Sequence, residues 1–88
     1  METIDKKKLK ADAHGLKPVV LIGHAGLTDA VLAEIEAALA YHELIKVKIR
    51  AEREERKQMT EMMVQRTDSE LIQTIGQMTV LYKRNPNK

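Results

Sequence analysis

Gly23 and Gly26 enclose only His24 and Ala25, and this loop is the part of the chain best suited to bind a ligand. Glycine lets the backbone turn tightly and lets a partner approach with no Cβ in the way. Thr28 can cap a helix that starts just after the loop, and free N–H groups at a helix start favour an anion such as phosphate. The spacing therefore predicts either a phosphate-binding loop or a tight strand-to-helix turn that simply requires glycine.

Two other phosphate-binding motifs do not fit this segment. A dinucleotide-binding fingerprint needs a third glycine, an acidic residue on the next strand and a larger sheet. A P-loop needs Gly-Lys-Ser/Thr, whereas Leu27 follows Gly26. What remains is a short Gly-x-x-Gly loop of the kind that KH domains use to clamp a nucleic-acid backbone.

The other polar residues give no sign of catalysis or of a metal site. His14, His24 and His42 are far apart, and no pair of them has the spacing of metal ligands. The chain has no cysteine, which excludes disulfides, thiolate nucleophiles and cysteine-bound metals. No Ser, His and Asp arrangement suggests a nucleophile. We therefore expect a protein that is not an enzyme and uses no cofactor, metal or small-molecule substrate.

Length and hydropathy set the architecture and the compartment. Eighty-eight residues are enough for one small domain, and we expect it to span residues 1–88, with its core over about 3–84 and a tail over 85–88. No apolar run approaches the ~20 residues of a membrane span, and the N-terminal segment lacks the apolar region of a signal peptide. We expect a cytoplasmic monomer that does not bind membranes.

Basic residues gather in separate segments, although the formal net charge is only +2. The acidic residues lie mainly in predicted helices. Such segregation suggests an anionic partner on one face, although lysines kept for solubility would give a similar pattern. The basic residues that we expect to contribute to binding are Lys7, Lys8, Lys10, Lys17, Lys46, Lys48, Arg50, Lys83 and Arg84.

Seven elements must position these residues. Apolar periodicity predicts helices over residues 3–14, 29–41 and 52–66, and strands over 19–22, 44–50, 71–75 and 78–83. The strand over 19–22 is a continuous apolar run and is expected to be buried. The strand over 44–50 alternates strictly, which directs Lys46, Lys48 and Arg50 to one outer face. Gly76 and Gln77 form the turn of a final hairpin.

The helix ends carry further signals. Thr3 is a possible cap of the first helix, and Gly15 suits the left-handed position that ends one. In the third helix, Met59, Met62 and Met63 lie three and four residues apart and are expected to pack on the core. The alternative is an adaptable methionine surface that binds another protein.

The order α-β-α-β-α-β-β predicts an α/β fold in which helices pack on a four-stranded mixed sheet. The only aromatic residues are Tyr41 and Tyr82. A platform that stacks single-stranded bases needs exposed aromatic side chains. If the partner is RNA, we therefore expect recognition of phosphate and shape, with little reading of bases.

Three pieces of the chain together resemble the CRM domain (chloroplast RNA splicing and ribosome maturation). They are residues 16–28, which include the glycine loop, residues 42–48, and the segment that runs from Ile75-Gly76 to residues 80–82. The similarity covers nearly the whole chain and is greatest to the stand-alone bacterial members, the YhbY type.

This resemblance implies a fold like the C-terminal domain of the third bacterial translation initiation factor, with a KH-like loop. It also implies that Gly23, His24, Ala25 and Gly26 and the adjoining basic surface bind ribosomal RNA in precursors of the large subunit (50S) and assist ribosome assembly. Relatives often have more polar or basic residues where this chain has His24 and Ala25. The alternative function is a protein-interaction adaptor that uses the methionine-rich helix without contacting RNA.

Overall fold

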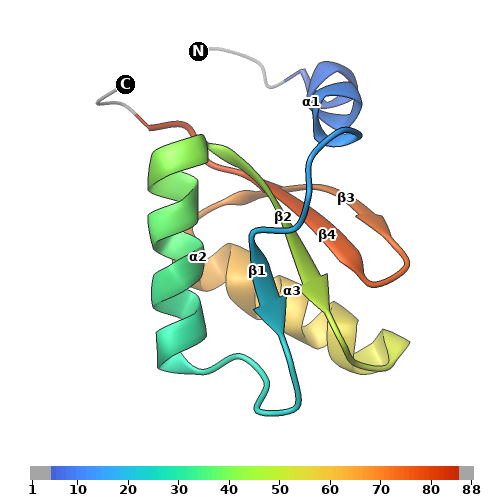
Figure 1. Cartoon of the computed structure of the whole chain (residues 1–88), viewed down its shortest axis with the longest axis vertical. Coiled ribbons are helices and arrows are strands. Elements are labelled where there is room, and N and C mark those ends of the chain that lie inside the picture. The colour runs from blue at the N-terminus through green and yellow to red at the C-terminus, as the bar shows by residue number, and fades with distance from the viewer. Residues whose placement is uncertain (1–4, 86–88) are drawn as a thin grey trace.

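The computed structural model describes residues 5–85 and arranges them as a four-stranded sheet with three helices packed on it (Figure 1). The strand order is β1-β2-β4-β3, in which β1 is parallel to β2 and the other neighbours are antiparallel. The predicted α/β class and mixed sheet are confirmed. The elements are α1 (Lys6–Ala13), β1 (Val20–Ile22), α2 (Asp29–His42), β2 (Leu44–Ile49), α3 (Arg53–Thr67), β3 (Glu70–Ile75) and β4 (Met78–Tyr82).

Hydrophobic alternation along β2 builds the main core. Ile45, Val47 and Ile49 are all buried on one face of the sheet. There they meet Ile35 of α2 and Met63 of α3. Strand side chains alternate between faces, so Lys46 and Lys48 lie on the other face, as the sequence predicts. We call that second face, opposite α2 and α3, the open face.

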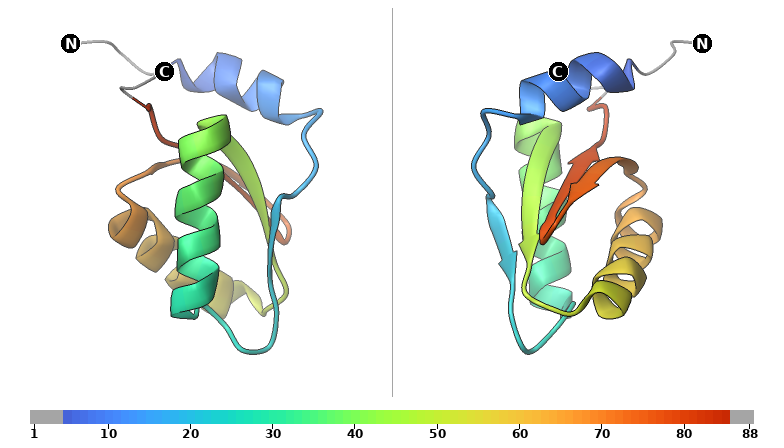
Figure 2. Two further views of the ribbon diagram at one scale, coloured as in Figure 1. Left: turned by 60° about the vertical axis from the view of Figure 1, so that its left-hand side comes forward. Right: turned by 90° about the vertical axis from the view of Figure 1, so that its right-hand side faces the viewer.

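Helix α1 covers only one end of the open face, which Figure 2 shows as α1 crossing above the strands. Its apolar side forms a second, smaller cluster with β3 and β4. Ala13 is buried there against Ile72 and Val80, and Leu9 packs beside them. Ile72 lies at an irregularity between Leu71 and Gln73, where the pairing of β3 with β4 shifts by one residue. Such a bulge re-aims a side chain, and here Ile72 faces α1.

The ends of α1 differ from the sequence prediction. Asp5 caps the helix, because its carboxylate accepts a hydrogen bond from the Lys8 backbone N–H at 3.1 Å. Thr3 lies outside the described residues. Gly15 is not left-handed, so the prediction of a glycine stop is wrong. The helix ends instead at His14 in ordinary helical geometry.

The sequence predicts a buried first strand, but only alternate residues of this segment are buried. Val20 and Ile22 enter the core, but Leu21 between them is 50% exposed and Val19 is also exposed. Strand β1 is an edge strand that pairs only with β2. No helix covers the open face at this position, so every second side chain of an apolar run remains in contact with solvent.

The methionines of α3 do not all face the core. Met63 is completely buried and Met59 packs against the core, as predicted, but Met62 is 44% exposed. Adjacent residues on a helix are about 100° apart, and here Met63 points at the sheet while Met62 points away from it. Because the other two pack inward, the described residues offer no continuous methionine surface to a protein partner.

The cap of α2 and the turn of the final hairpin form as predicted. Thr28 caps α2, with its hydroxyl oxygen accepting from the Val31 N–H at 3.2 Å. Gly76 adopts a φ of 56° in the two-residue turn between β3 and β4. No helix within residues 5–85 is long and apolar enough to cross a membrane.

Candidate nucleic-acid interface

The glycine loop connects β1 to α2 and lies at the end of the molecule away from α1 (Figure 1). Its turn is closed by a hydrogen bond from the Gly26 N–H to the Gly23 carbonyl at 3.1 Å. His24 and Ala25 occupy the tip and are exposed. The loop therefore presents two backbone units and two side chains to solvent beside the start of a helix.

The two glycines have different reasons to be glycine. Gly26 has a φ of 75°, a conformation that side chains with a Cβ adopt only with strain. Gly23 has no positive φ, and a Cβ built on it would meet nothing within 4 Å. The turn thus requires Gly26, whereas the fold would accept alanine at Gly23. Glycine at position 23 is therefore explained better by a partner whose backbone approaches closely than by the fold.

The start of α2 supplies hydrogen-bond donors next to the loop. Thr28 accepts two of these N–H groups: its hydroxyl oxygen accepts from the Val31 N–H, and its carbonyl accepts from the Leu32 N–H. The N–H groups of Asp29 and Ala30, in the first turn, have no acceptor within the helix. Asp29 also places a carboxylate in that turn. Anion binding here therefore depends on backbone donors and on a nearby cation.

Arg50 is the predicted cation nearest to this loop along the sheet. Its backbone N–H donates to the carbonyl of Ile22, the residue just before Gly23, at 3.0 Å. Arg50 follows the last residue of β2 and is exposed, so the predicted strand is one residue too long. The structure thus brings one of the predicted basic residues to the base of the glycine loop.

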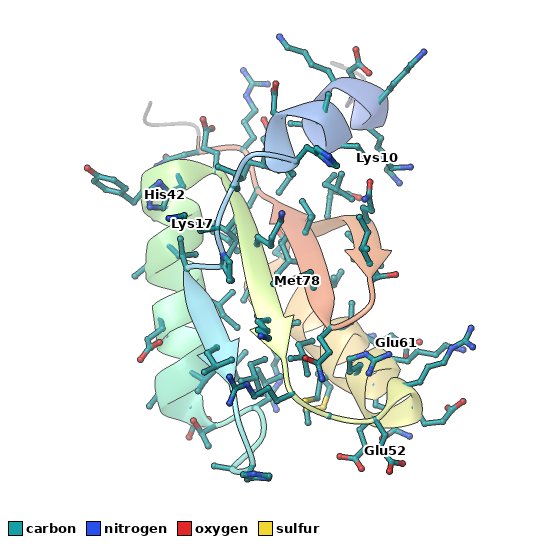
Figure 3. The ribbon with its side chains drawn as sticks, turned by 45° about the vertical axis from the view of Figure 1, so that its right-hand side comes forward. Lys10, Lys17, His42, Glu52, Glu61 and Met78 are labelled. Carbon is teal, nitrogen blue, oxygen red and sulfur yellow. The ribbon has the colours of Figure 1, made fainter. Side chains whose placement is uncertain are left out.

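Lys46 and Lys48 extend from this point along the open face. Lys48 pairs in register with Leu21 of β1 and with Met78 of β4, and Lys46 pairs with Val80. Figure 3 labels Met78 on β4, beside β2. Within residues 5–85, no hydrogen bond or ion pair engages the ammonium group of either lysine. Both cations are available to an anion laid across the sheet.

The other predicted basic residues lie at the opposite end of the molecule. Lys7, Lys8 and Lys10 are exposed on α1, and Lys17 is exposed in the segment that leads to β1. Figure 3 labels Lys10 and Lys17. The molecule is 37 Å along its longest axis, with the loop near one end and α1 near the other (Figure 1). Lys46 and Lys48 lie on the open face between these two ends.

The C-terminal basic residues are tied into the fold. The Lys83 ammonium donates to the Thr67 carbonyl at the end of α3, at 2.9 Å, and the Lys83 backbone N–H donates to Glu43. Arg84 precedes Asn85, which donates from its side chain to the Ala40 carbonyl of α2. Lys83 thus has a structural role that sequence reasoning missed, and its role in binding stays a prediction.

Sequence reasoning also missed the basic residues of α3. Arg53, Arg56 and Lys57 are spaced by three and four residues, which places them on one side of the helix. That spacing is present in the sequence, but the adjacent glutamates make the segment look like an ordinary solvated helix face.

The histidines His14, His24 and His42 lie at three separate places, and no cluster of metal-binding side chains occurs in the described part of the chain.

Comparison with known proteins identifies relatives along nearly the whole chain. The chain is 46% identical over 82 residues to a protein of Pseudomonas aeruginosa named "Probable RNA-binding protein", covering 92% of this chain and 79% of that one. It is 49% identical over 84 residues to an RNA-binding protein of Haemophilus influenzae, covering 94% and 85%. The solution structure of a hypothetical protein from Staphylococcus aureus superimposes with a TM-score of 0.82 at 34% identity, covering 94% and 88%.

The model of the CRS1 / YhbY (CRM) domain family matches residues 1–83. This match includes the glycine loop, the basic strand β2 and the final hairpin. By its sequence, by its relatives and by its fold, this chain belongs to the CRS1 / YhbY (CRM) domain family.

Proposed function

We propose that this protein is a non-catalytic RNA-binding protein that binds ribosomal RNA in precursors of the large subunit and assists their assembly. The observation that carries the proposal is Gly23, a glycine that the fold does not require, at the mouth of a loop beside free helix N–H groups. The names of the relatives from Pseudomonas aeruginosa and Haemophilus influenzae support RNA as the partner. The proposal implies a cytoplasmic protein that acts as a monomer.

The proposed interface begins at the glycine loop and continues over Arg50, Lys48 and Lys46 on the open face. A phosphate would accept hydrogen bonds from the backbone at the loop and the start of α2, while the cations neutralise neighbouring phosphates. The described aromatic side chains, Tyr41 and Tyr82, lie on α2 and at the end of β4, away from the loop. The binding energy is therefore expected to come from phosphate contacts and shape.

The direct test is to crosslink the protein to RNA in living cells and to sequence the attached RNA. We expect large-subunit ribosomal RNA to be enriched over small-subunit ribosomal RNA, and the protein to cosediment with precursor particles rather than with finished ribosomes. A population dominated by messenger or transfer RNA would contradict the ribosomal part of the proposal. Recovery of no RNA would contradict RNA binding itself.

Neutralising two lysines tests the open face. The variant with Lys46→Gln and Lys48→Gln should bind all RNA sequences more weakly, because phosphate contacts carry no sequence information. Each lost phosphate contact should also flatten the slope of log affinity against log salt by about 0.7–0.9. The control is Arg66→Gln, which removes an exposed positive charge from the last turn of α3. An unchanged slope in the double variant would place the RNA elsewhere on the molecule.

A further inference from the structure

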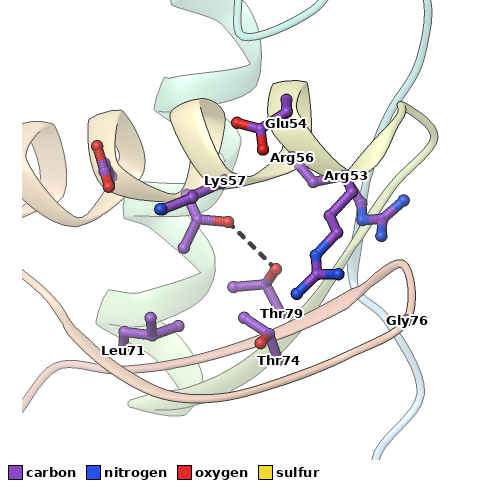
Figure 4. A pocket seen from close by; sticks show the side chains of 10 residues that line it. Arg53, Glu54, Arg56, Lys57, Leu71, Thr74, Gly76 and Thr79 are labelled. Carbon is purple, nitrogen blue, oxygen red and sulfur yellow. Dashed lines mark hydrogen bonds between the residues drawn. The ribbon is translucent and has the colours of Figure 1, made fainter.

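A groove of about 780 Å³ lies between the N-terminal half of α3 and the hairpin of β3 and β4 (Figure 4). It exists because α3 covers only part of its side of the sheet. Leu81 of β4 is buried under the helices, yet its partner in register, Leu71 of β3, is 36% exposed. Thr74 of β3 is likewise exposed on this side. The groove is separate from the open face and from the glycine loop.

Three cations line the helix wall of the groove. Arg53, Arg56 and Lys57 are opposed by the carboxylates of Glu54 and Glu61, which leaves one positive charge in excess. Arg56 is held in place because its Nη1 donates to the Ala51 carbonyl at 2.7 Å. A guanidinium has five N–H donors, so Arg56 keeps others for a ligand. These cations give the groove the donors that a phosphate group accepts from.

Two buried hydroxyl groups line the groove between helix and sheet. Thr60 is 5% exposed and Thr79 is 3% exposed, and their Oγ1 atoms are 3.5 Å apart (Figure 4). This separation is longer than the roughly 2.7–2.8 Å of a typical O–H···O hydrogen bond. Each hydroxyl therefore retains capacity to donate to or accept from a ligand. Thr74 adds a third hydroxyl on the strand side.

The groove changes in character along its length. Figure 4 shows Arg53 near the Gly76 turn and Leu71 at the other end, with Lys57 on the helix wall and its side chain extending toward the Leu71 side. The groove would be complemented by a ligand with an anionic group at the Arg53 end, polar groups in the middle and a flat apolar group over Leu71. A nucleotide has this order of groups in its phosphate, ribose and base. The volume lies in the range of about 300–1,000 Å³ that is usual for small-ligand sites.

The groove also lies within reach of an RNA held by the glycine loop. The Gly76 turn is joined to the end of β2, because the Ile49 N–H donates to the Gln77 carbonyl at 2.8 Å. On the other side of α3, the methyl carbon of Met59 is 3.8 Å from where a Cβ on Gly26 would stand. The arginine end of the groove and the loop thus flank the first turns of one helix.

We propose that this groove binds one unpaired nucleotide of an RNA strand, with its phosphate on Arg53 and Lys57 and its base against Leu71. The inference rests on the proposed function in taking RNA as the partner, and it adds a second contact that requires a single strand. In a duplex, paired bases are stacked inside and cannot enter such a groove, whereas unpaired bases can be splayed out into it.

The test compares a blunt stem-loop RNA with the same stem-loop carrying a short 3′ oligouridine extension. The extension should raise the affinity of the parent protein by about tenfold, and the variant with Arg53→Gln and Lys57→Gln should lose most of this gain. Glu61→Gln should increase the gain, because it removes a negative charge from the groove. The controls lie on α3 outside the groove: Glu55→Gln matches Glu61→Gln in charge, and Arg66→Gln removes one positive charge, and both should leave the gain unchanged.

A nuclear magnetic resonance titration with oligouridylate alone separates the two proposals. We expect amide shifts at Lys57, Thr74, Gly76 and Thr79, whether or not the stem-loop binds at the glycine loop. Failure of the stem-loop to bind, with these shifts present, would contradict the proposed function and leave the groove site standing. Shifts confined to residues 23–26, or an affinity gain that survives Arg53→Gln with Lys57→Gln, would overturn the groove proposal.

Discussion

A protein carrying both His24→Asp and Ala25→Asp is expected to remain folded and to bind RNA at least about tenfold more weakly than the parent, a loss of about 1.4 kcal/mol. Both side chains are exposed at the tip of the glycine loop, and neither glycine is changed. Two new carboxylates would repel a phosphate that approaches the loop. Near the N-terminus of α2 they should stabilise folding slightly, by ~0.3–1 kcal/mol each. Folding and binding would thus move in opposite directions, which a general loss of structure cannot imitate.

The matched control places the same two charges on α2 instead of in the glycine loop. Ala33 and Ala37 are exposed on this helix, and Ala33→Asp with Ala37→Asp makes the same change in net charge. Filter binding of labelled precursor ribosomal RNA, with a thermal melt of each variant, should show weak binding for the loop variant alone. Equal losses in both variants would mean that only net charge matters. If the loop variant bound RNA as tightly as the parent, the loop would be only a turn between β1 and α2.

The two glycines offer an internal comparison for the same loop. Gly23→Ala is expected to leave stability unchanged or to raise it by about 0.4–1 kcal/mol, because alanine restricts the unfolded chain. Gly26→Ala should destabilise the fold by roughly 1 kcal/mol or more, because its φ of 75° is strained for alanine. If RNA backbone approaches Gly23 closely, Gly23→Ala should still weaken binding. Full binding by this stable variant would argue against close approach there.

Met63→Ala is expected to lower the free energy of unfolding by about 2–5 kcal/mol. Met63 is completely buried between α3 and the sheet. Truncating it removes apolar contacts and leaves a cavity that the surrounding strands can close only in part. In a domain of this size, each kcal/mol lowers Tm by roughly 4–8 °C, so a thermal melt would show the change clearly.

The adjacent residue is the control for this substitution. Met62→Ala removes the same atoms from the same helix, but Met62 is exposed, so its effect should stay within about 0.5 kcal/mol. Met63→Leu keeps most of the volume and should cost less than about 1.5 kcal/mol. Similar losses at Met62 and Met63 would contradict the assignment of Met63 alone to the core, because alanine is the better helix former and cannot lose stability through helix propensity.

Local features of the fold were predictable because each is decided within a few residues. The alternation of Ile45, Val47 and Ile49 with lysines determines both faces of β2, whatever its neighbours are. Thr28 caps α2 through a bond to Val31, three residues away. Gly76 supplies the positive φ that a two-residue hairpin turn needs. The glycine loop is recognisable for the same reason, and these same segments carry the family resemblance.

The tertiary structure alone decided which surfaces are covered and which functional residues come together. Leu21 is apolar but exposed, because β1 is an edge strand and no helix crosses it on the open face. The lysines of α1 are distant from the loop, because α1 packs over Ile72 and Val80 at the far end of the sheet. Leu71 borders a groove because α3 covers only part of its side of the sheet and leaves Leu71 exposed. Which surfaces of the sheet are covered depends on packing between segments that are far apart in the chain. The spacing of residues within one segment carries no information about that packing.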